Sequence, residues 1–211
     1  TLFPTTRAPF ETSYDVNLLI EVGATSDRDC LPGPDGQTPI AAHLEETLAA
    51  MLEDGMVLDA VVAQNATQRA EMWARREQAA EVVLHRKPIV NNDIAVPLDR
   101  VATFLKTMEQ RLPTVDPDAY SLTVAHLGDG NVHYTVLPKS TDPVVHDQIM
   151  ELVEDVSLSL GGSFSAEHGI GTSKKSSMAR RKNPVALQAM RAIKSALDPN
   201  GIMNPGKVLP D

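Results

Sequence analysis

The sequence predicts an α+β fold, in which a mostly antiparallel sheet has helices packed on one face. Short runs rich in Val, Ile and Leu alternate with longer segments whose apolar residues recur at helical spacing. Asp129-Gly130, a dipeptide typical of tight hairpins, separates two of the strand-like runs. Thr38-Pro39, Asp142-Pro143 and Asn183-Pro184 each combine a helix-capping residue with a proline suited to the first helical position. These features indicate a fold related to the ferredoxin-like class, followed by a C-terminal helical tail.

In the N-terminal half, the predicted order is strand, helix, strand, helix. Residues 16–22 and 57–63 are predicted strands, because Leu, Ile and Val are concentrated in both. After the first of them, the run Pro-Gly-Pro-Asp-Gly marks residues 26–37 as a loop. The two helices are expected at residues 38–55 and 66–84, where apolar residues recur at helical spacing.

The C-terminal half contains a longer alternation of the same kind. Its strands are predicted at residues 89–96, 120–125 and 132–137, with a brief further strand at 163–165. Its helices are predicted at residues 97–112, 142–160 and 183–197. Pro and Gly punctuate residues 198–211, which are expected to form an extended tail. No internal repeat or domain boundary is visible, so residues 1–211 are expected to form one domain.

Composition and charge exclude several classes of protein. The formal net charge of -9 argues against a nucleic-acid footprint and against adhesion to an anionic membrane surface. No apolar run approaches the roughly 18 residues that a transmembrane helix needs. Cys30 is the only cysteine, which prevents an intramolecular disulfide and suits a reducing compartment. No signal peptide is visible and the chain does not begin with Met, so we expect a processed product or a piece of a longer protein.

Two histidines flank the hairpin dipeptide. If Asp129 and Gly130 form a two-residue type I′ turn, His126 lies directly opposite His133 on the same face of the hairpin. Residues in such pairs have Cβ atoms roughly 4.5–5.5 Å apart. Two imidazoles at that separation can share one divalent cation. The alternative is a pair of polar surface histidines beside a turn.

A carboxylate is the natural third ligand, and Glu167 in the glycine-rich segment 161–171 is the candidate. Three protein ligands leave positions at the metal for water or substrate. If the backbone is extended there, the side chain of His168 diverges from that of Glu167 and is left to act as a base. Glu167 could instead be an ordinary carboxylate at a helix start or on the surface.

Several motifs resemble the C-terminal domain of FAD-linked oxidases. The most specific are His-Leu-Gly-Asp-Gly-Asn-Val-His at 126–133 and Gly-Gly-Ser-Phe-Ser-Ala-Glu-His-Gly-Ile-Gly-Thr-Ser-Lys at 161–174. Trp73-Ala74-Arg75-Arg76-Glu77, Asp93-Ile94-Ala95-Val96-Pro97 and residues 198–210 match in the same order. The resemblance covers nearly the whole chain. It is to the vanillyl-alcohol-oxidase type, in the branch that holds D-lactate, glycolate and D-2-hydroxyglutarate dehydrogenases.

The resemblance implies an oxidoreductase whose FAD-binding domain lies N-terminal to this one and is absent from the chain. It implies His126, His133 and Glu167 as ligands of zinc or manganese, and His168 as the catalytic base. The implied reaction oxidises a D-2-hydroxy acid to the 2-oxo acid, with hydride transfer to FAD. A small 2-hydroxy acid is then the expected partner, the electron acceptor is not indicated, and a homodimer stays open. The expected location is the cytoplasm of a bacterium or the mitochondrial matrix of a eukaryote.

Two further roles come from the resemblance alone. Arg76 matches an arginine that holds the substrate carboxylate, which a guanidinium group can do with two hydrogen bonds. Asn204, in the Asn-Pro-Gly-Lys tail, is the candidate for contact with the flavin. Without the resemblance, Arg76 would be interpreted as a solvated helix residue and Asn204 as a turn residue before Pro205.

Three positions depart from the pattern of members that act on D-2-hydroxyglutarate. Those members tend to have Thr, Lys and Asn where this chain has Ala80, Asn91 and Thr135. Ala80 and Asn91 cannot anchor the distal carboxylate of a dicarboxylic acid in the same way. A different or smaller 2-hydroxy acid therefore stays open.

Two other functions fit the same residues. A stand-alone metal-dependent hydrolase would use the same three ligands with an activated water, and would act without flavin. A non-catalytic fragment would only bind a ligand or mediate contacts between subunits. A flavin domain upstream in the natural protein would favour the oxidoreductase over the hydrolase. Because no complete flavin site is present here, we expect the isolated chain to be inactive.

Overall fold

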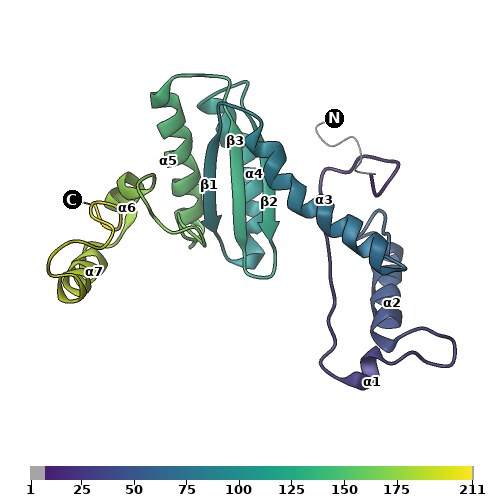
Figure 1. The fold of residues 1–211 in the computed structure, drawn as a ribbon. Coiled ribbons are helices and arrows are strands. Elements are labelled where there is room, and N and C mark those ends of the chain that lie inside the picture. The colour runs from purple at the N-terminus through teal and green to yellow at the C-terminus, as the bar shows by residue number, and fades with distance from the viewer. Residues whose placement is uncertain (1–7, 211) are drawn as a thin grey trace. The chain divides into compact units, whose positions relative to one another are not determined.

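The computed structural model describes residues 8–210, apart from the side chains of residue 80 and residues 82–84. The chain divides into two compact units, Thr1–Val82 and Val83–Asp211. Figure 1 shows the elements in chain order. Helix α3 (Ala66–Leu84) runs across the division, which is why no Pro- or Gly-rich linker marks it in the sequence. A single domain over residues 1–211 stays a prediction.

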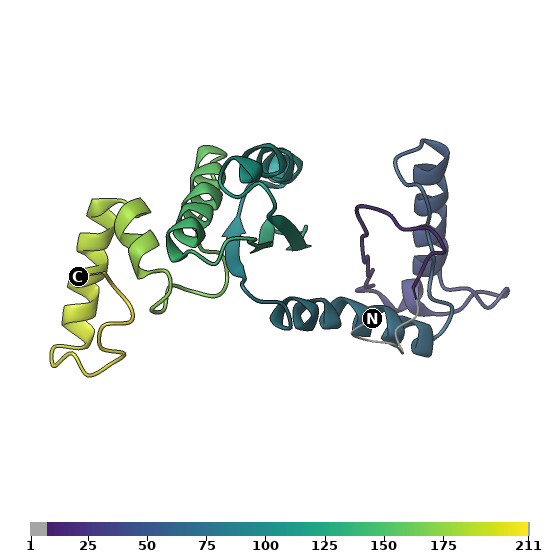
Figure 2. The ribbon, with the colours of Figure 1, turned by 90° about the horizontal axis from the view of Figure 1, so that it is seen from above.

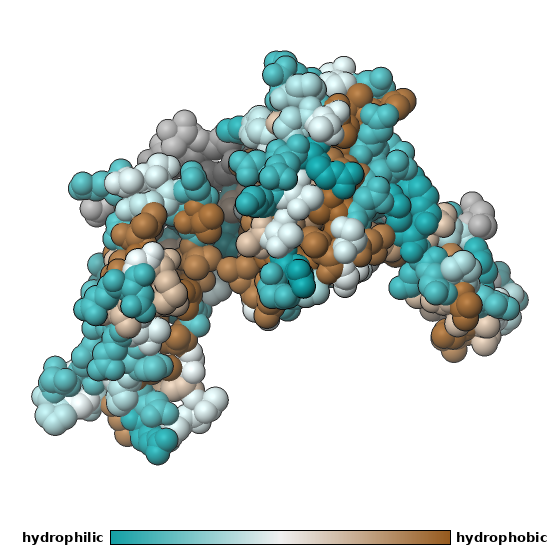
Figure 3. Space-filling view, turned by 180° about the vertical axis from the view of Figure 1, so that it is seen from behind, coloured by the Kyte–Doolittle hydropathy of each residue, from teal (hydrophilic) through white to brown (hydrophobic). Residues whose placement is uncertain are grey.

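Helices dominate the N-terminal unit. The predicted helices at 38–55 and 66–84 are confirmed as α2 (Pro39–Glu53) and α3. The predicted loop at 26–37 also contains a single helical turn, α1 (Asp27–Cys30). An ion pair between Glu21 and Arg69 joins the segment before α1 to α3. Several large apolar side chains of this unit are exposed (Figure 3).

The two strands predicted in the N-terminal unit are wrong. Residues 16–22 and 57–63 form no strand in the described structure. Their apolar side chains are largely exposed, with Val16 at 73%, Leu18 at 59% and Leu58 at 79% of full exposure. A strand needs a neighbouring strand to pair its backbone N–H and C=O groups, and apolar composition does not provide one. The apolar composition therefore predicted buried side chains, but these side chains are largely exposed within this unit.

The C-terminal unit confirms the α+β prediction. Its sheet has the order β1-β3-β2 with both strand pairs antiparallel. The strands are β1 (Val90–Ala95), β2 (Tyr120–His126) and β3 (Asn131–Leu137). Two main helices accompany them, α4 (Val101–Arg111), extended by short 3₁₀ turns η1 (Leu98–Arg100) and η2 (Leu112–Thr114), and α5 (Pro143–Ser159). A single bridge between Ala95 and Ser163 follows α5, so the β-α-β-β-α order ends with a rudiment of the fourth ferredoxin-like strand.

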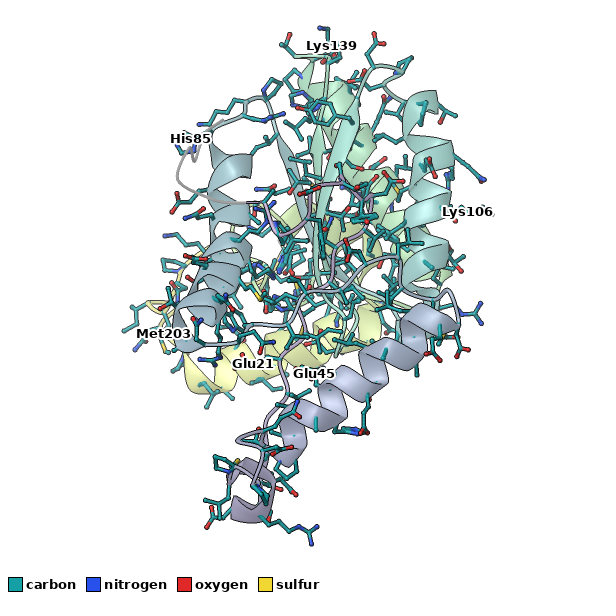
Figure 4. The ribbon with its side chains drawn as sticks, turned by 90° about the vertical axis from the view of Figure 1, so that its right-hand side faces the viewer. Glu21, Glu45, His85, Lys106, Lys139 and Met203 are labelled. Carbon is teal, nitrogen blue, oxygen red and sulfur yellow. The ribbon has the colours of Figure 1, made fainter. Side chains whose placement is uncertain are left out.

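Helices α4 and α5 cover the same face of the sheet (Figure 2). The core between them is fully buried, and the ring of Phe104 packs edge-on against Tyr134 with centroids 5.4 Å apart. The sheet contributes Ile94, Val132, Tyr134 and Val136 to this core, and the helices contribute Phe104, Met108, Ile149, Val153 and Val156. Lys106 lies on the outer side of α4, away from the sheet (Figure 4). One face of each helix is thus buried, as the apolar spacing predicted.

The capping predictions hold at two of the three proposed helix starts. Asp142 accepts a hydrogen bond from the Val144 N–H at 2.9 Å, at the start of α5. Asn183 accepts one from the Val185 N–H at 2.8 Å, at the start of α7 (Pro184–Leu197). The side chain of Thr38 makes no capping hydrogen bond, although α2 begins directly after it. No helix in the described part of the chain is long and apolar enough to cross a membrane.

The C-terminal tail contains one helix that the sequence analysis did not predict, α6 (Lys175–Arg181). Arg181 on this helix pairs with the buried Glu154 of α5, with 3.2 Å between Nε and Oε2. Beyond α7, Asp198 accepts hydrogen bonds from the N–H groups of Ile202 and Met203, both at 2.9 Å. The tail after residue 198 is therefore a series of turns held by a carboxylate rather than an extended segment.

Candidate metal centre and active site

The candidate site lies on the face of the sheet opposite α4 and α5. Successive side chains of a strand point to opposite faces. Ile94 and Val132 are paired and belong to the apolar core, so their neighbours Asp93 and His133, which are also paired, point to the other face. His126 is on that same face, because it pairs with Asn131, two residues before His133. The core face of the sheet is therefore mostly apolar, and the opposite face carries Asp93, His126 and His133.

The predicted register of the hairpin is wrong. His126 pairs with Asn131, and His133 pairs with Val124, so the two histidines are not directly opposite each other. A type I′ turn needs positive φ at both central residues, whereas only Gly130 has it, at +75°. The connection is instead four residues long, 127–130, and the His126 carbonyl accepts from the Gly130 N–H at 3.1 Å.

Contacts outside the hairpin explain the longer turn. The Gly130 carbonyl accepts a hydrogen bond from the Val96 N–H at 3.1 Å, which ties the turn to the end of β1. Despite the changed register, the rings of His126 and His133 still meet as diagonal neighbours. Their centroids are 5.3 Å apart and their planes are nearly perpendicular, at 83°. The predicted proximity of the two rings is confirmed, although it arises from a different pairing.

Replacing Gly130 with Ala is expected to destabilise the C-terminal unit. A Cβ atom at this position would lie 2.0 Å from the Val96 carbonyl oxygen, and the backbone has positive φ. The left-handed conformation alone costs roughly 1–2 kcal/mol for a non-glycine residue, and the overlap adds to this. Urea unfolding of the full-length protein measures the loss. The control is Gly128→Ala in the same turn, where nothing lies within 4 Å of the added atom; equal stability of the two variants would contradict this account.

The loop that carries Glu167 and His168 is held against β1. Ala95 and Ser163 exchange backbone hydrogen bonds of 3.0 and 2.8 Å, and the Ala166 N–H donates to the Asp93 carbonyl at 3.1 Å. Gly162 permits this approach, because a Cβ there would lie 2.1 Å from the Ala95 carbonyl oxygen. The loop therefore reaches the same end of the sheet as the two histidines.

The side chain of Asp93 continues this attachment. Its Oδ2 accepts from the backbone N–H of Glu167 at 3.1 Å and of His168 at 2.9 Å. The Lys174 Nζ lies 3.3 Å from the same oxygen. Because both backbone N–H groups point to one oxygen, the chain bends at these residues instead of running extended. The expected divergence of the two side chains is therefore wrong, and His168 Nε2 lies 3.5 Å from Glu167 Oε1.

Four residues form a group that could hold a metal ion: Asp93, His133, Glu167 and His168. One potential ligand atom from each lies within 4.8 Å of the others. His133 is at the centre, with Nε2 3.2 Å from Glu167 Oε1 and Nδ1 3.6 Å from Asp93 Oδ1. Its ring centroid is 5.3 Å from that of His168. Of the predicted ligands, His133 and Glu167 belong to this group, and His126 stands beside it.

Burial and charge favour the protonation states that a metal needs. Burial lowers the pKa of His133 below its ordinary value, although the carboxylates of Asp93 and Glu167 act in the opposite direction. Burial raises the pKa of Asp93, but the His168 N–H and the Lys174 ammonium group lower it more, so the net shift is downward. A neutral imidazole and an ionised carboxylate are the forms that bind divalent metals. The residues present thus fit a divalent cation.

The other two predicted site residues, Arg76 and Asn204, are not members of this group of four. Arg76 is half-buried on α3 in the N-terminal unit, whereas the histidines belong to the C-terminal unit. Asn204 is the one non-glycine residue in the described part of the chain with positive φ, at +48°. That conformation is typical of a turn and does not by itself indicate a ligand. The roles of both residues stay predictions.

Two of the three positions that depart from the hydroxyglutarate pattern meet in the structure. Asn91 on β1 pairs with Thr135 on β3, and the Thr135 hydroxyl donates to Asn91 Oδ1 at 2.8 Å. Both lie on the face of the sheet that carries His133, because each is two residues from a member of the Asp93–His133 pair. The third, Ala80, has a side chain outside the described part of the structure.

Comparison with known proteins shows the family. Residues 30–208 match the model of the FAD linked oxidases, C-terminal domain. The chain belongs to this family. The matched stretch extends over parts of both units, so the FAD-linked oxidase C-terminal domain is not confined to the sheet and its helices.

Several relatives are similar along most of the chain. A D-2-hydroxyglutarate dehydrogenase of Stutzerimonas stutzeri (strain A1501) is 33% identical over 213 residues, covering 95% of this chain and 42% of the relative. The mitochondrial D-2-hydroxyglutarate dehydrogenase of Bos taurus is 33% identical over 180 residues, covering 85% of this chain and 32% of the relative. A probable mitochondrial D-2-hydroxyglutarate dehydrogenase of Oryza sativa subsp. indica is 35% identical over 169 residues, covering 80% and 30%. The chain thus spans less than half the length of these relatives.

Asp93 is the site residue to which the sequence analysis assigned no role. It was noted only as the first residue of a matching pentapeptide. One signal for Asp93 was available in the sequence, namely a carboxylate inside a predicted strand. A buried charge is costly unless it is paired, so a carboxylate at such a position often has a functional role. Its partners come from residues 133, 167, 168 and 174, which are distant in sequence, so spacing alone did not reveal them.

Proposed function

We propose that this domain supplies the metal- and substrate-binding half of an FAD-dependent dehydrogenase that oxidises a D-2-hydroxy acid to the 2-oxo acid. The carrying observation is the convergence of His133, Glu167 and His168, since Glu167 Oε1 lies 3.2 Å from one imidazole and 3.5 Å from the other. Family membership and the names of the relatives support the same reaction class. The family and the relatives favour the dehydrogenase over the metal-dependent hydrolase, which is supported only by the set of potential metal ligands.

In this proposal, His126, His133 and Glu167 hold the divalent ion, zinc or manganese. When bound there, the ion would act as a Lewis acid that lowers the pKa of the substrate hydroxyl, and FAD held by the rest of the protein would be the hydride acceptor. His168 takes the hydroxyl proton. Its ring is accessible for this, because 64% of its side chain is exposed while its backbone is fixed by Asp93. Arg76 holds the substrate carboxylate, and Asn204 contacts the flavin.

The substrate proposed is a D-2-hydroxy acid that is smaller or less charged at its distal end than hydroxyglutarate. The hydrogen-bonded pair Asn91 and Thr135 supports this, because it places two uncharged side chains on the face that carries the histidines. Their hydrogen-bonding groups are partly used by each other. A neutral pair of this kind lacks the positive charge that a second carboxylate requires when it is removed from water. The relatives, by contrast, are named for a dicarboxylic acid.

The proposed location follows the relatives. Those from Bos taurus and Danio rerio are named as mitochondrial, and others come from bacteria. We therefore propose the mitochondrial matrix for a eukaryotic source and the cytoplasm for a bacterial one. A homodimer and the identity of the electron acceptor stay open.

A panel of 2-hydroxy acids tests the proposed function in the full-length protein. Flavin reduction is followed by absorbance under anaerobic conditions, with D-lactate, D-2-hydroxybutyrate and D-2-hydroxyglutarate. We expect reduction by at least one D-acid, a preference for the monocarboxylic members, and no reduction by the L-enantiomers. Absence of flavin reduction with every D-2-hydroxy acid would overturn the proposed reaction. A preference for D-2-hydroxyglutarate would overturn only the substrate assignment.

A further inference from the structure

The carboxylate of Asp93 is shared between two parts of the candidate site. Its Oδ2 accepts from the N–H groups of Glu167 and His168 and pairs with the Lys174 ammonium group. Its Oδ1 faces His133 Nδ1 at 3.6 Å. Asp93 is nearly fully buried, with 6% of the residue exposed. One buried side chain therefore contacts both His133 on β3 and the loop that carries Glu167 and His168.

The two oxygens of Asp93 are in different states. Oδ2 already has three donors, whereas Oδ1 is buried and has no hydrogen-bond partner within the described residues. A buried acceptor that lacks a donor destabilises the folded state. His133 Nδ1, 3.6 Å from Oδ1, is a candidate donor for this oxygen. It needs to approach by only a fraction of an ångström to form a hydrogen bond.

The position of His133 makes the choice of its protonated nitrogen important. Its Nε2 faces Glu167 Oε1 at 3.2 Å, and Nδ1 faces Asp93 on the other side of the ring. A histidine can bind a metal only through a nitrogen that carries no proton. The other nitrogen then donates to an acceptor, which fixes the tautomer and the orientation of the ring.

We propose that Asp93 is a positioning residue that prepares this site for the metal. Through Oδ1 it holds the proton of His133 on Nδ1 and leaves Nε2, which lies 3.2 Å from Glu167 Oε1, without a proton and able to bind the ion. Through Oδ2 it fixes the backbone of residues 167 and 168. The proposal deepens the metal site of the proposed function and rests on it, but it assigns to Asp93 no direct bond to the ion, because Oδ2 is occupied and Oδ1 faces the opposite nitrogen.

The test compares Asp93→Asn with the matched variant Asp116→Asn in the full-length protein. Asp116 is also buried and also accepts two backbone N–H groups, those of Lys139 at 2.8 Å and Ser140 at 3.0 Å. Asp116 lies shortly before the start of β2, and Lys139 and Ser140 lie shortly after the end of β3. These hydrogen bonds of Asp116 involve neither His133 nor His168. In Asp93→Asn, the new carbonyl oxygen can keep accepting from the loop, while the NH₂ group faces His133 Nδ1 and favours a proton on Nε2 instead.

Two readouts that do not depend on catalytic activity are measured. The first is the affinity for Zn²⁺ and Mn²⁺, by competition with a chromogenic chelator. We expect Asp93→Asn to weaken the metal affinity by about 10- to 100-fold, as for other groups that orient a ligating histidine. Asp116→Asn should leave the affinity within about 2-fold of the unsubstituted protein, because Asp116 orients no proposed ligand. The second is the ¹⁵N NMR spectrum of metal-free protein with labelled histidine, where His133 should carry its proton on Nδ1 and should change tautomer in Asp93→Asn.

The outcomes separate this proposal from the proposed function. Equal metal affinity of Asp93→Asn and Asp116→Asn, or an unchanged tautomer of His133, would overturn the role of Asp93. If the unsubstituted protein binds neither metal, the proposed metal site fails, and the tautomer of His133 alone decides whether Asp93 positions the ring. A parallel loss of affinity in both Asn variants would indicate a general structural effect and would also overturn the proposal.

Discussion

Replacing His168 with Ala is expected to slow flavin reduction by a D-2-hydroxy acid by about 100- to 10,000-fold, the usual contribution of a positioned general base. The reason is that the substrate hydroxyl must lose its proton as the hydride leaves, and the imidazole of His168 is more accessible than that of His133. His168 has 64% of its side chain exposed, against 24% for His133. The measurement is single-turnover flavin reduction in the full-length protein.

Metal content is the second part of the His168 experiment. His168 Nε2 lies 3.5 Å from Glu167 Oε1, so the ring stands close enough to the candidate ligands for a direct bond to be tested. We expect elemental analysis to show unchanged metal in His168→Ala, as a base that is not a ligand requires. Loss of metal would make His168 a ligand, and surviving turnover would remove it as the base. His43→Ala, at an exposed position on α2, is the control and should change neither.

Replacing His133 with Ala is expected to abolish stoichiometric metal binding. His133 is the central residue of the cluster, with a carboxylate beside each ring nitrogen and the ring of His126 5.3 Å away. Removal of the ring deletes one of three proposed ligands, and should weaken affinity by more than the roughly 10- to 100-fold typical of an outer-sphere partner. Elemental analysis for zinc and manganese in the purified full-length protein gives the result directly.

A second histidine in the same unit provides the control for this measurement. His146 lies on α5 with Nε2 2.7 Å from the Ser140 carbonyl oxygen, so its removal perturbs a local hydrogen bond and no proposed ligand. His146→Ala should keep its metal. His126→Ala should lose it, because this residue is the proposed third ligand. Retention of metal in both His133→Ala and His126→Ala would place the site elsewhere in the protein.

Much of the C-terminal unit follows from local sequence. Asp142-Pro143 and Asn183-Pro184 predicted the starts of α5 and α7, since a capping side chain and a proline act on the first helical turn itself. The three strands and α4 were predicted within a few residues, because their apolar periodicity matches the single face that each element buries. The presence of two histidines near a turn, and of Glu167-His168 in a glycine-rich loop, is likewise visible in the sequence alone.

Where the prediction failed, the deciding contacts come from distant residues. The apolar segments at 16–22 and 57–63 form no strands, because composition does not supply a partner strand. The hairpin at Asp129-Gly130 has a four-residue connection, because Gly130 is hydrogen-bonded to Val96. Neither partner can be identified from the residues inside the segment.

The sequence by itself therefore determined which chemical groups this domain offers: two imidazoles beside a hairpin, and a carboxylate and a further imidazole in a later loop. Tertiary structure alone decided how they are arranged. It is the pairing of β1 with β3 that sets Asp93 beside His133, and the docking of the loop on β1 that sets Glu167 and His168 at the same carboxylate. The physical reason is that helix caps and periodicity act over a few residues. The geometry of this site depends instead on contacts between segments that are distant in sequence, 40 residues for Asp93 and His133 and 75 for Asp93 and His168, and local sequence carries no record of those contacts.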